Sequence, residues 1–128
     1  MDEHRPRLLV IEDDPDVRLF MVLALRSEGY DVVSAADAHQ AIEQLGKHAF
    51  DVILTDFGLP GKDGLMLLEE AEGRGLLRNA KVMMLTAFPW LARNVSVPVL
   101  PKPIDLDDLS LRLRSMLGTA DAPTPRHP

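Results

Sequence analysis

Cysteine is absent from the 128 residues of this chain. Its absence excludes disulfide bonds and thiolate metal sites, and it is typical of proteins in a reducing compartment. The sequence also lacks an apolar run long enough to span a membrane, and its first seven residues, which are polar and charged, do not form a signal peptide. We therefore expect a cytoplasmic protein with no membrane partner.

Basic residues are too few to form a nucleic-acid-binding surface. The chain has 14 lysines and arginines against 20 aspartates and glutamates, and its net charge is −6. Direct binding to nucleic acid is therefore not expected. Apolar residues make up 46% of the composition, enough for one domain of this length to bury a core. We expect that domain at residues 7–118, between a flexible N-terminus (1–6) and a disordered tail (119–128).

The central feature of the sequence is the stretch 51–60, in which an apolar run ends in Asp56 and is followed by a glycine and a proline. A short run rich in β-branched residues, closed by turn-forming residues, predicts a buried strand. No polar residue alternates with the apolar ones, so both faces should be covered, as in a parallel sheet. Asp56 then lies at the carboxyl end of a central strand, where open α/β sheets bind ligands. A lone aspartate could also simply end the strand, so a functional role for Asp56 depends on which other polar residues lie near it.

Four further apolar runs alternate with helical patterns along the chain. Strands are expected at residues 7–11, 30–35, 51–55, 81–85 and 97–100, and helices at 15–28, 38–47, 65–72 and 104–117. Such alternation predicts an α/β fold with a parallel sheet and right-handed crossovers. The prolines of the last strand suit only an edge of the sheet.

The first predicted helix has more apolar residues than one face can use. Its core stripe is expected to contain Val17, Phe20, Met21 and Ala24. A second apolar set, on another face, consists of Leu19, Val22 and Leu23. This second set is either a contact surface, for a partner protein or a second copy of the chain, or it is covered by neighbouring helices.

Polar side chains follow the predicted strands at the edge where their carboxyl ends meet. These are Glu12, Asp13, Asp56, Thr86 and Lys102. Three clustered carboxylates repel one another, and a hard divalent cation such as Mg2+ relieves that repulsion. Phosphoryl transfer needs a nucleophilic carboxylate, a cation and a hydroxyl beside the metal, and Asp56, Lys102 and Thr86 match these three roles.

Four sequence motifs carry these residues: Leu-Leu-Val-Ile-Glu-Asp-Asp at 8–14, Asp-Val-Ile-Leu-Thr-Asp-Phe-Gly-Leu-Pro-Gly-Lys-Asp-Gly at 51–64, Val-Met-Met-Leu-Thr-Ala at 82–87, and Pro-Lys-Pro at 101–103. With them, the sequence from about Arg7 to Leu117 closely resembles the receiver domains of two-component response regulators. The resemblance implies a doubly wound, flavodoxin-like sheet of five parallel strands, with strand order 2-1-3-4-5 and five helices.

The resemblance also implies a function for the acidic cluster. Asp56 is expected to accept a phosphoryl group from a histidine kinase or a histidine phosphotransfer protein. Asp13, Asp56 and the main-chain carbonyl of Gly58 are expected to hold Mg2+, with Glu12 acting through a water. Such a protein is a phosphoacceptor that assists its own phosphorylation and dephosphorylation, and it is not expected to be an enzyme.

Two further residues have roles implied by the resemblance. Thr86 is expected to move towards the phosphoryl group and bond one of its oxygens, while Lys102 pairs with the group. The Lys102–Pro103 peptide bond is expected to be cis, as is usual in this family. Gly58 and Phe88 offer no polar side chain to orient a hydrolytic water, so self-dephosphorylation should be slow to moderate.

The connection that follows Thr86 departs from the family pattern. Only fifteen residues, 87–101, separate it from the lysine of the Pro-Lys-Pro motif, fewer than is typical. The fourth helix should therefore be shortened or irregular, or be replaced by an ordered loop pinned by Trp90. Val99 stands where many receivers have the aromatic residue that moves with the threonine. We therefore expect the segment 88–97 to be the element that orders or moves on phosphorylation.

No output domain follows Leu117, so the sequence looks like a stand-alone receiver that relays or drains a signal through contacts with a target protein or in a homodimer. The sequence also has three alternative interpretations. The chain could be a receiver-like interaction module that is not phosphorylated. It could be an Mg2+-dependent phosphatase with an aspartyl nucleophile, although Gly58 replaces the second acid of such enzymes. The Asp-Phe-Gly triplet at 56–58 also imitates the metal-binding motif of protein kinases, whose other motifs are absent.

Overall fold

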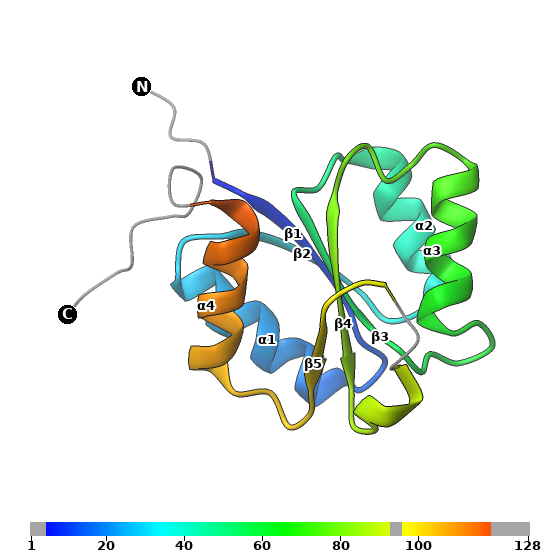
Figure 1. Cartoon of the computed structure of the whole chain (residues 1–128). Helices are drawn as coiled ribbons and strands as arrows, with labels where there is room; N and C mark the ends of the chain where they lie inside the picture. Colours follow the sequence, from blue (N-terminus) through cyan, green and yellow to red (C-terminus); the bar gives the residue numbers. More distant parts are fainter. Residues whose placement is uncertain (1–4, 93–95, 119–128) are drawn as a thin grey trace.

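Five parallel strands form a single sheet with the order β2-β1-β3-β4-β5 (Figure 1). The order confirms the doubly wound, flavodoxin-like fold, and the proline-containing strand β5 lies at an edge, as predicted. The computed structural model describes residues 5–92 and 96–118, so most of the expected flexible N-terminus, part of segment 88–97 and the tail 119–128 lie outside the described residues. The strands are β1 (Arg7–Ile11), β2 (Asp31–Ala35), β3 (Val52–Asp56), β4 (Lys81–Thr86) and β5 (Val99–Pro101).

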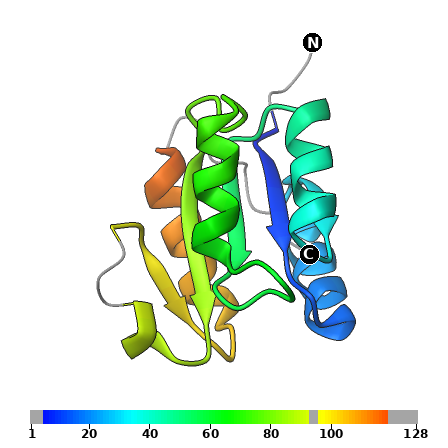
Figure 2. The same cartoon turned by 90° about the vertical axis from the view of Figure 1, so that its right-hand side faces the viewer.

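Helices cover both faces of the sheet. They are α1 (Pro15–Ser27), α2 (Ala38–Lys47), α3 (Gly64–Gly73) and α4 (Leu106–Leu117), with a short 3₁₀ helix, η1 (Pro89–Ala92), after β4. The helices α1 and α4 pack on one face, and α2 and α3 pack on the other, which is turned towards the viewer in Figure 2. Within the described ranges, no helix combines the length and apolar character that crossing a membrane requires.

The strands supply alternate residues to two separate cores. In β1, Leu8 and Val10 pack with α1 and α4, whereas Leu9 and Ile11 pack with α2 and α3. The central strand β3 divides its residues in the same way. Because successive strand side chains point to opposite faces, a sheet covered on both faces requires an unbroken apolar run.

Each α-helix begins with an aspartate that caps it. Asp14 accepts hydrogen bonds from two main-chain amides of α1, and Asp37, Asp63 and Asp105 accept at least one from the first turns of α2, α3 and α4. Aspartate is a favoured N-cap because its carboxylate satisfies amides that have no partner within the helix. Because each of these helices follows a strand of the parallel sheet, the capped ends lie at the same edge of the sheet as the carboxyl ends of the strands.

The orientation of α1 differs from the predicted one. Its buried residues are Met21, Val22 and Leu25, whereas Phe20 is half exposed. The predicted core stripe was thus wrong at Phe20, and Val22, which was assigned to the outer face, is buried. The surplus of apolar residues explains the error, because several stripes on this helix satisfy the helical spacing and only the contact with the sheet selects one.

The connection from β4 to β5 contains one short helix, η1, among its described residues. This four-residue 3₁₀ helix confirms the predicted shortening of the fourth helix. Trp90 is 60% exposed and Phe88 is 52% exposed, so Trp90 does not pin the segment to the core. The two rings contact each other edge to face, with their centroids 5.5 Å apart. Residues 93–95 of the segment lie outside the described part of the chain.

Candidate functional site

The strand ends bring the five polar residues to one edge of the sheet. Asp56 is the last residue of β3, Thr86 is the last residue of β4, and Glu12 and Asp13 directly follow β1. Lys102 directly follows β5, and the peptide bond after it is cis. The parallel registers of β1 with β3, β3 with β4, and β4 with β5 keep these ends level. The carboxyl edge of the sheet therefore carries all five side chains, where ligands of this fold class bind.

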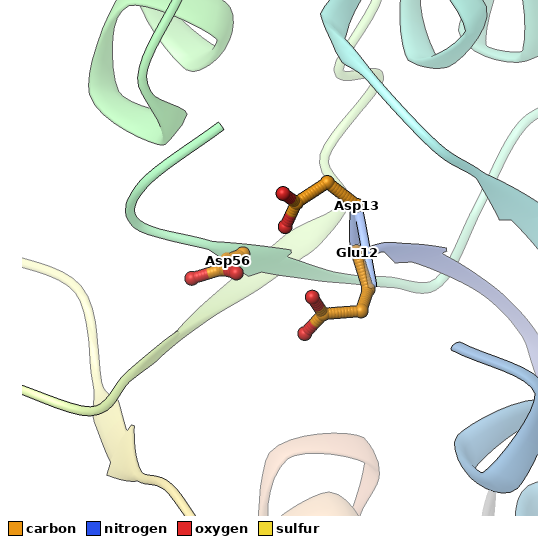
Figure 3. A group of neighbouring side chains, drawn as sticks. All are labelled: Glu12, Asp13 and Asp56. Carbon is orange, nitrogen blue, oxygen red and sulfur yellow. The ribbon is translucent and has the colours of Figure 1, made fainter. Parts of the chain in front are cut away.

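The side chains of Glu12, Asp13 and Asp56 extend into the same space at the sheet edge (Figure 3). One carboxylate oxygen from each lies within 4.8 Å of the others. Glu12 and Asp56 are buried, while Asp13 is exposed to solvent. Mg2+ binds through a few carboxylate oxygens and keeps several waters, so a partly exposed acidic cluster suits it. The chemistry of these three residues therefore fits a magnesium ion.

Lys102 neutralises part of this negative charge. Its Nζ donates hydrogen bonds to Asp56 Oδ2 at 2.9 Å and to Glu12 Oε1 at 2.5 Å. Burial lowers the pKa of Lys102, but the hydrogen bonds to Glu12 and Asp56 outweigh burial and raise this pKa above its ordinary value. Lys102 therefore stays protonated across the neutral range and links the ends of β1, β3 and β5.

The environment of Glu12 disfavours its charged form. Only 1% of this residue is exposed, and burial raises the pKa of its carboxyl above the ordinary value. Hydrogen bonds from Lys102 and from the main-chain N–H of Asp14 lower this pKa in part, and repulsion by Asp56 adds to the rise. A second cation beside Glu12 would stabilise the ionised cluster, which is a further reason for a metal to bind here.

Thr86 is buried, and its side chain holds the turn that follows β4. Its Oγ1 accepts a hydrogen bond of 3.0 Å from the main-chain N–H of Phe88. Its carbonyl accepts one of 2.8 Å from the N–H of Lys102, which extends the β4–β5 pairing to the lysine. Because the hydroxyl oxygen is the acceptor in the bond with Phe88, the hydroxyl proton can be donated to an incoming oxygen.

Gly58 lies in the loop after β3. Its main-chain N–H donates a hydrogen bond of 3.3 Å to Asp56 Oδ1, so this part of the loop touches the central carboxylate. A Cβ at this position would meet no atom within 4 Å. A larger residue would therefore fit at position 58, and the contribution of Gly58 to the site comes from its main chain.

Three residues at the site were not singled out by sequence reasoning. Arg18 on α1 donates from Nη1 to the carbonyls of the two residues after β1, at 2.8 and 3.4 Å, and so tethers the β1–α1 loop. The hydroxyl of Thr55 donates to the carbonyl of Asp56 at 3.0 Å. Gly64 lies against the same carbonyl. The sequence gives no signal of these contacts, because each of them is made to a main-chain atom.

An apolar hollow of about 540 Å³ adjoins the site on the side of α1. A larger hollow of about 900 Å³ lies between α2, α3 and the loop after β3, and it reaches Asp13. The site is therefore bordered by an apolar surface on one side and by a surface of mixed charge on the other. The apolar hollow is lined by Val17, Phe20, Ala87, Lys102, Pro103 and Ile104.

The sequence is similar to known receiver domains. The family model described as the response regulator receiver domain matches residues 8–114. The chain is 35% identical to the response regulator receiver protein CpdR of Brucella abortus over 120 residues, which cover 89% of this chain and 98% of CpdR. It is also 35% identical to the transcriptional activator protein PfeR of Pseudomonas aeruginosa over 118 residues, which cover 88% of this chain but only 38% of PfeR.

The fold is similar to that of a solved receiver domain. The receiver domain of the sensor histidine kinase PA1611 from Pseudomonas aeruginosa PAO1 is 28% identical to this chain, with a TM-score of 0.79. The match covers 88% of this chain and 98% of that domain. The PA1611 domain has a magnesium ion coordinated in its active site cleft. The residues matched by the family model include all five polar residues at the sheet edge.

Proposed function

The chain belongs to the response regulator receiver domain family of two-component signalling, and we propose that it accepts a phosphoryl group on Asp56 and relays or drains a signal through protein contacts. The observation that carries the proposal is the position of Asp56, which is buried beside two further carboxylates and bonded to Lys102. Phosphoryl transfer to an aspartate requires this combination of a nucleophilic carboxylate, a cation and a metal-binding acidic group.

The phosphoryl donor in this proposal is a phosphohistidine of a histidine kinase or of a histidine phosphotransfer protein. An oxygen of Asp56 attacks the phosphorus, the bond from phosphorus to the histidine nitrogen breaks, and its electron pair leaves with that nitrogen. The products are an acyl phosphate on Asp56 and a free histidine, which takes up a proton. A bound magnesium ion supplies positive charge to the oxygens of the transferring group.

Four residues are proposed to hold the magnesium ion: Asp13, Asp56, Gly58 through its main-chain carbonyl, and Glu12 through a water. The clustering of the three carboxylates supports this assignment, and so does the magnesium ion in the similar PA1611 receiver domain. The raised pKa of Glu12, which burial causes, also favours the binding of a cation, because a cation stabilises the ionised carboxylate.

Lys102 and Thr86 are proposed to bind the transferred group. Lys102 bonds Asp56 Oδ2, and its ammonium can pair with a phosphoryl oxygen after transfer. The Thr86 hydroxyl can donate its proton to another phosphoryl oxygen if the side chain turns towards Asp56. Such a turn lengthens or breaks the hydrogen bond from Phe88. We therefore propose that the described part of the segment 88–97 responds to phosphorylation.

The outer face of α1 is the proposed docking surface for the phosphodonor. Leu19, Phe20 and Leu23 are 57%, 50% and 57% exposed, and Phe20 also lines the apolar hollow beside Lys102. An amphipathic helix of a kinase or phosphotransfer protein can bury these side chains and bring its histidine to the sheet edge. A downstream target or a second copy of the chain is a further proposed partner, and the proposed compartment is the cytoplasm.

Labelling by a small phosphodonor tests the proposal. The parent protein and Asp56→Asn are incubated with a radiolabelled acyl phosphate, with Mg2+ or with EDTA, and the protein-bound label is counted. We expect label on the parent only when Mg2+ is present, and none on Asp56→Asn. Equal labelling of the two proteins would contradict the assignment of Asp56, and an unlabelled parent would contradict the proposed function.

A receiver-like interaction module that is never phosphorylated is the second candidate function. The observation in its favour is Val99 on β5, which provides no aromatic side chain to move with Thr86. Beryllofluoride with Mg2+ mimics the phosphoryl group and separates the two functions. A spectral change on its addition supports a phosphoacceptor, whereas an unchanged spectrum supports the module. Turnover of phosphate esters would instead indicate a phosphatase.

A further inference from the structure

The main-chain carbonyl of Asp56 has two close neighbours besides its strand partners. The hydroxyl of Thr55, which is fully buried, donates a hydrogen bond of 3.0 Å to this oxygen. Gly64, the first residue of α3, lies so close that an added Cβ would stand 2.6 Å from the same oxygen. Real Cβ atoms essentially never approach other atoms so closely, so this position has room only for glycine.

Space, rather than backbone conformation, is the reason for a glycine at position 64. Its φ lies outside the left-handed region, so other residues could adopt this backbone conformation. The added Cβ would also meet Met84 Cε at 3.3 Å, but the end of a methionine side chain can move aside. The carbonyl of Asp56 moves less easily, because β3 is paired with β1 as far as Thr55 and with β4 as far as Asp56. Alanine would therefore displace either the start of α3 or Asp56 itself.

We propose that Gly64 and Thr55 are positioning residues for the Asp56 carboxylate, an inference that rests on the proposed function of Asp56. Gly64 lets α3 begin directly against the strand end, where its N–H donates a hydrogen bond of 2.8 Å to the carbonyl of Phe57. Thr55 holds the peptide group of Asp56 from within the strand. Together they determine where the carboxylate stands relative to Lys102 and the other acidic residues.

Small displacements are enough to affect such a site. Opening the contact from 2.6 Å to the 3.0 Å at which real Cβ contacts begin takes a shift of about 0.4 Å. Catalytic groups have to be held within about 0.5 Å of their productive geometry, and a misplacement of about 1 Å can lower a rate about a hundredfold. We therefore expect Gly64→Ala to lower the rate of Asp56 labelling at least about tenfold.

Gly73→Ala and Gly46→Ala are the matched controls. Gly73 ends the same helix and Gly46 lies in α2, and a Cβ at either position would meet no atom within 4 Å. For the parent and the three variants, the measurements are the Kd for Mg2+, the labelling rate with a small phosphodonor, and the thermal unfolding curve. Both controls should keep the parent's Kd and labelling rate, whereas Gly64→Ala should weaken Mg2+ binding and slow labelling.

A second pair of variants tests the same carbonyl without adding atoms. Thr55→Ser keeps the hydroxyl, and Thr55→Val replaces it with a methyl group of similar size. We expect Thr55→Val to weaken Mg2+ binding about tenfold, as the loss of a group that supports a metal ligand commonly does, and Thr55→Ser to keep most of the affinity. If Gly64→Ala does not fold, the two Thr55 variants still test whether contacts with the Asp56 carbonyl position its carboxylate.

The outcomes separate this inference from the proposed function. If the parent neither binds Mg2+ nor takes up label, the proposed function fails and the inference fails with it. If the parent does both, and Gly64→Ala and Thr55→Val match it, only the positioning role is overturned. A loss of thermal stability in Gly64→Ala, with Mg2+ affinity and labelling unchanged, also overturns it, because that pattern indicates a purely structural role.

Discussion

Lys102 is the residue on which the charge balance of the site depends. It pairs with Asp56 and Glu12, whose carboxylates are buried at the sheet edge. We predict that Lys102→Met lowers the free energy of unfolding by about 2 kcal/mol in the absence of Mg2+, because two buried carboxylates lose their cation. Urea unfolding measures this loss, and added Mg2+ should restore part of it.

Lys62→Met is the matched control for this prediction. Lys62 also pairs with a carboxylate, that of Glu70, but both side chains are about one-third exposed, and ion pairs near the surface contribute little to stability. The control should therefore lose much less stability than Lys102→Met and recover little with Mg2+. If the two variants lost equal free energy of unfolding, the burial of the carboxylates that pair with Lys102 would not contribute to stability.

Leu23 tests the docking face of α1. We predict that Leu23→Glu slows phosphotransfer from the donor protein, since a charge interrupts an apolar contact on this face. Labelling by a small phosphodonor and the free energy of unfolding should not change, because the side chain is exposed. Met66→Glu is the control, since Met66 is half exposed on α3, in the opposite helix layer. Slower transfer in both variants, or in neither, would reject this docking face.

At the level of residues, the acidic cluster could be predicted but its supports could not. Glu12, Asp13 and Asp56 end or follow apolar runs, and parallel strands align their ends, so the sequence alone brings these residues together. The contact of Gly64 with the Asp56 carbonyl depends on how closely α3 approaches β3, and no local sequence pattern predicts that distance. Phe20 was misassigned for a related reason, because helical spacing defines the faces of a helix and packing chooses among them.

At the level of elements, the loop between β3 and α3 is tied to its helix by ion pairs. Lys62 in the loop pairs with Glu70 on α3, and Arg74 pairs with the same carboxylate at 3.1 Å. The hydrogen bond from Lys62 is the largest of the effects that hold the pKa of Glu70 below its ordinary value of 4.5. The pair with Lys62 therefore joins the loop to α3, and the pair with Arg74 holds the same carboxylate from the end of the helix.

The lowered pKa of Glu70 predicts how the free energy of unfolding depends on pH. A carboxyl whose pKa is lower in the folded protein than in the unfolded chain contributes stability above the unfolded value, and this contribution is lost as the pH falls through the folded value. We predict that Glu70→Gln is less stable than the parent at neutral pH, and that the difference shrinks as the pH falls below 4.5. Urea unfolding at a series of pH values measures it, with Glu69→Gln as the control. A difference independent of pH would contradict the prediction.

The turn after β4 offers an optical test, because Trp90 is the only tryptophan of the chain. Thr86 and Phe88 share a hydrogen bond, and the ring of Phe88 contacts that of Trp90. We predict that beryllofluoride with Mg2+ shifts the emission of Trp90 in the parent and in Thr86→Ser, but not in Thr86→Val, which lacks the hydroxyl. Relaxation-dispersion NMR gives an independent measurement, and a segment that stays rigid and unchanged would count against the prediction.

The regular elements could be predicted more fully than the connection between β4 and β5. The five strands and four α-helices follow from apolar runs, helical spacing and aspartate caps, which are local signals. The shortness of the connection follows from a residue count. Its 3₁₀ form and the exposure of Trp90 could not be predicted, because four residues have no periodicity and a tryptophan is on average well buried.

At the level of the whole molecule, Mg2+ binding should stabilise the fold, because the acidic cluster is assembled only in the folded chain. A ligand that binds only the folded state adds about 2.7 kcal/mol at a concentration of a hundred times its Kd. We predict that Mg2+ raises the Tm of the parent and has much less effect on Asp13→Asn, which lacks one of the three carboxylates. Sodium chloride at equal ionic strength controls for screening. Equal rises in both proteins would contradict a specific site.

The hydrogen bond between Lys102 and Glu12 joins residues that are 90 positions apart in the chain. The site therefore needs Glu12, which follows β1, and Lys102, which follows β5. A fragment that lacks either end of this range cannot assemble it. Under the proposed function, a chain still being synthesised, or one clipped before β5, cannot be modified at Asp56. The modification then reports that the chain from β1 to Lys102 has been made and folded.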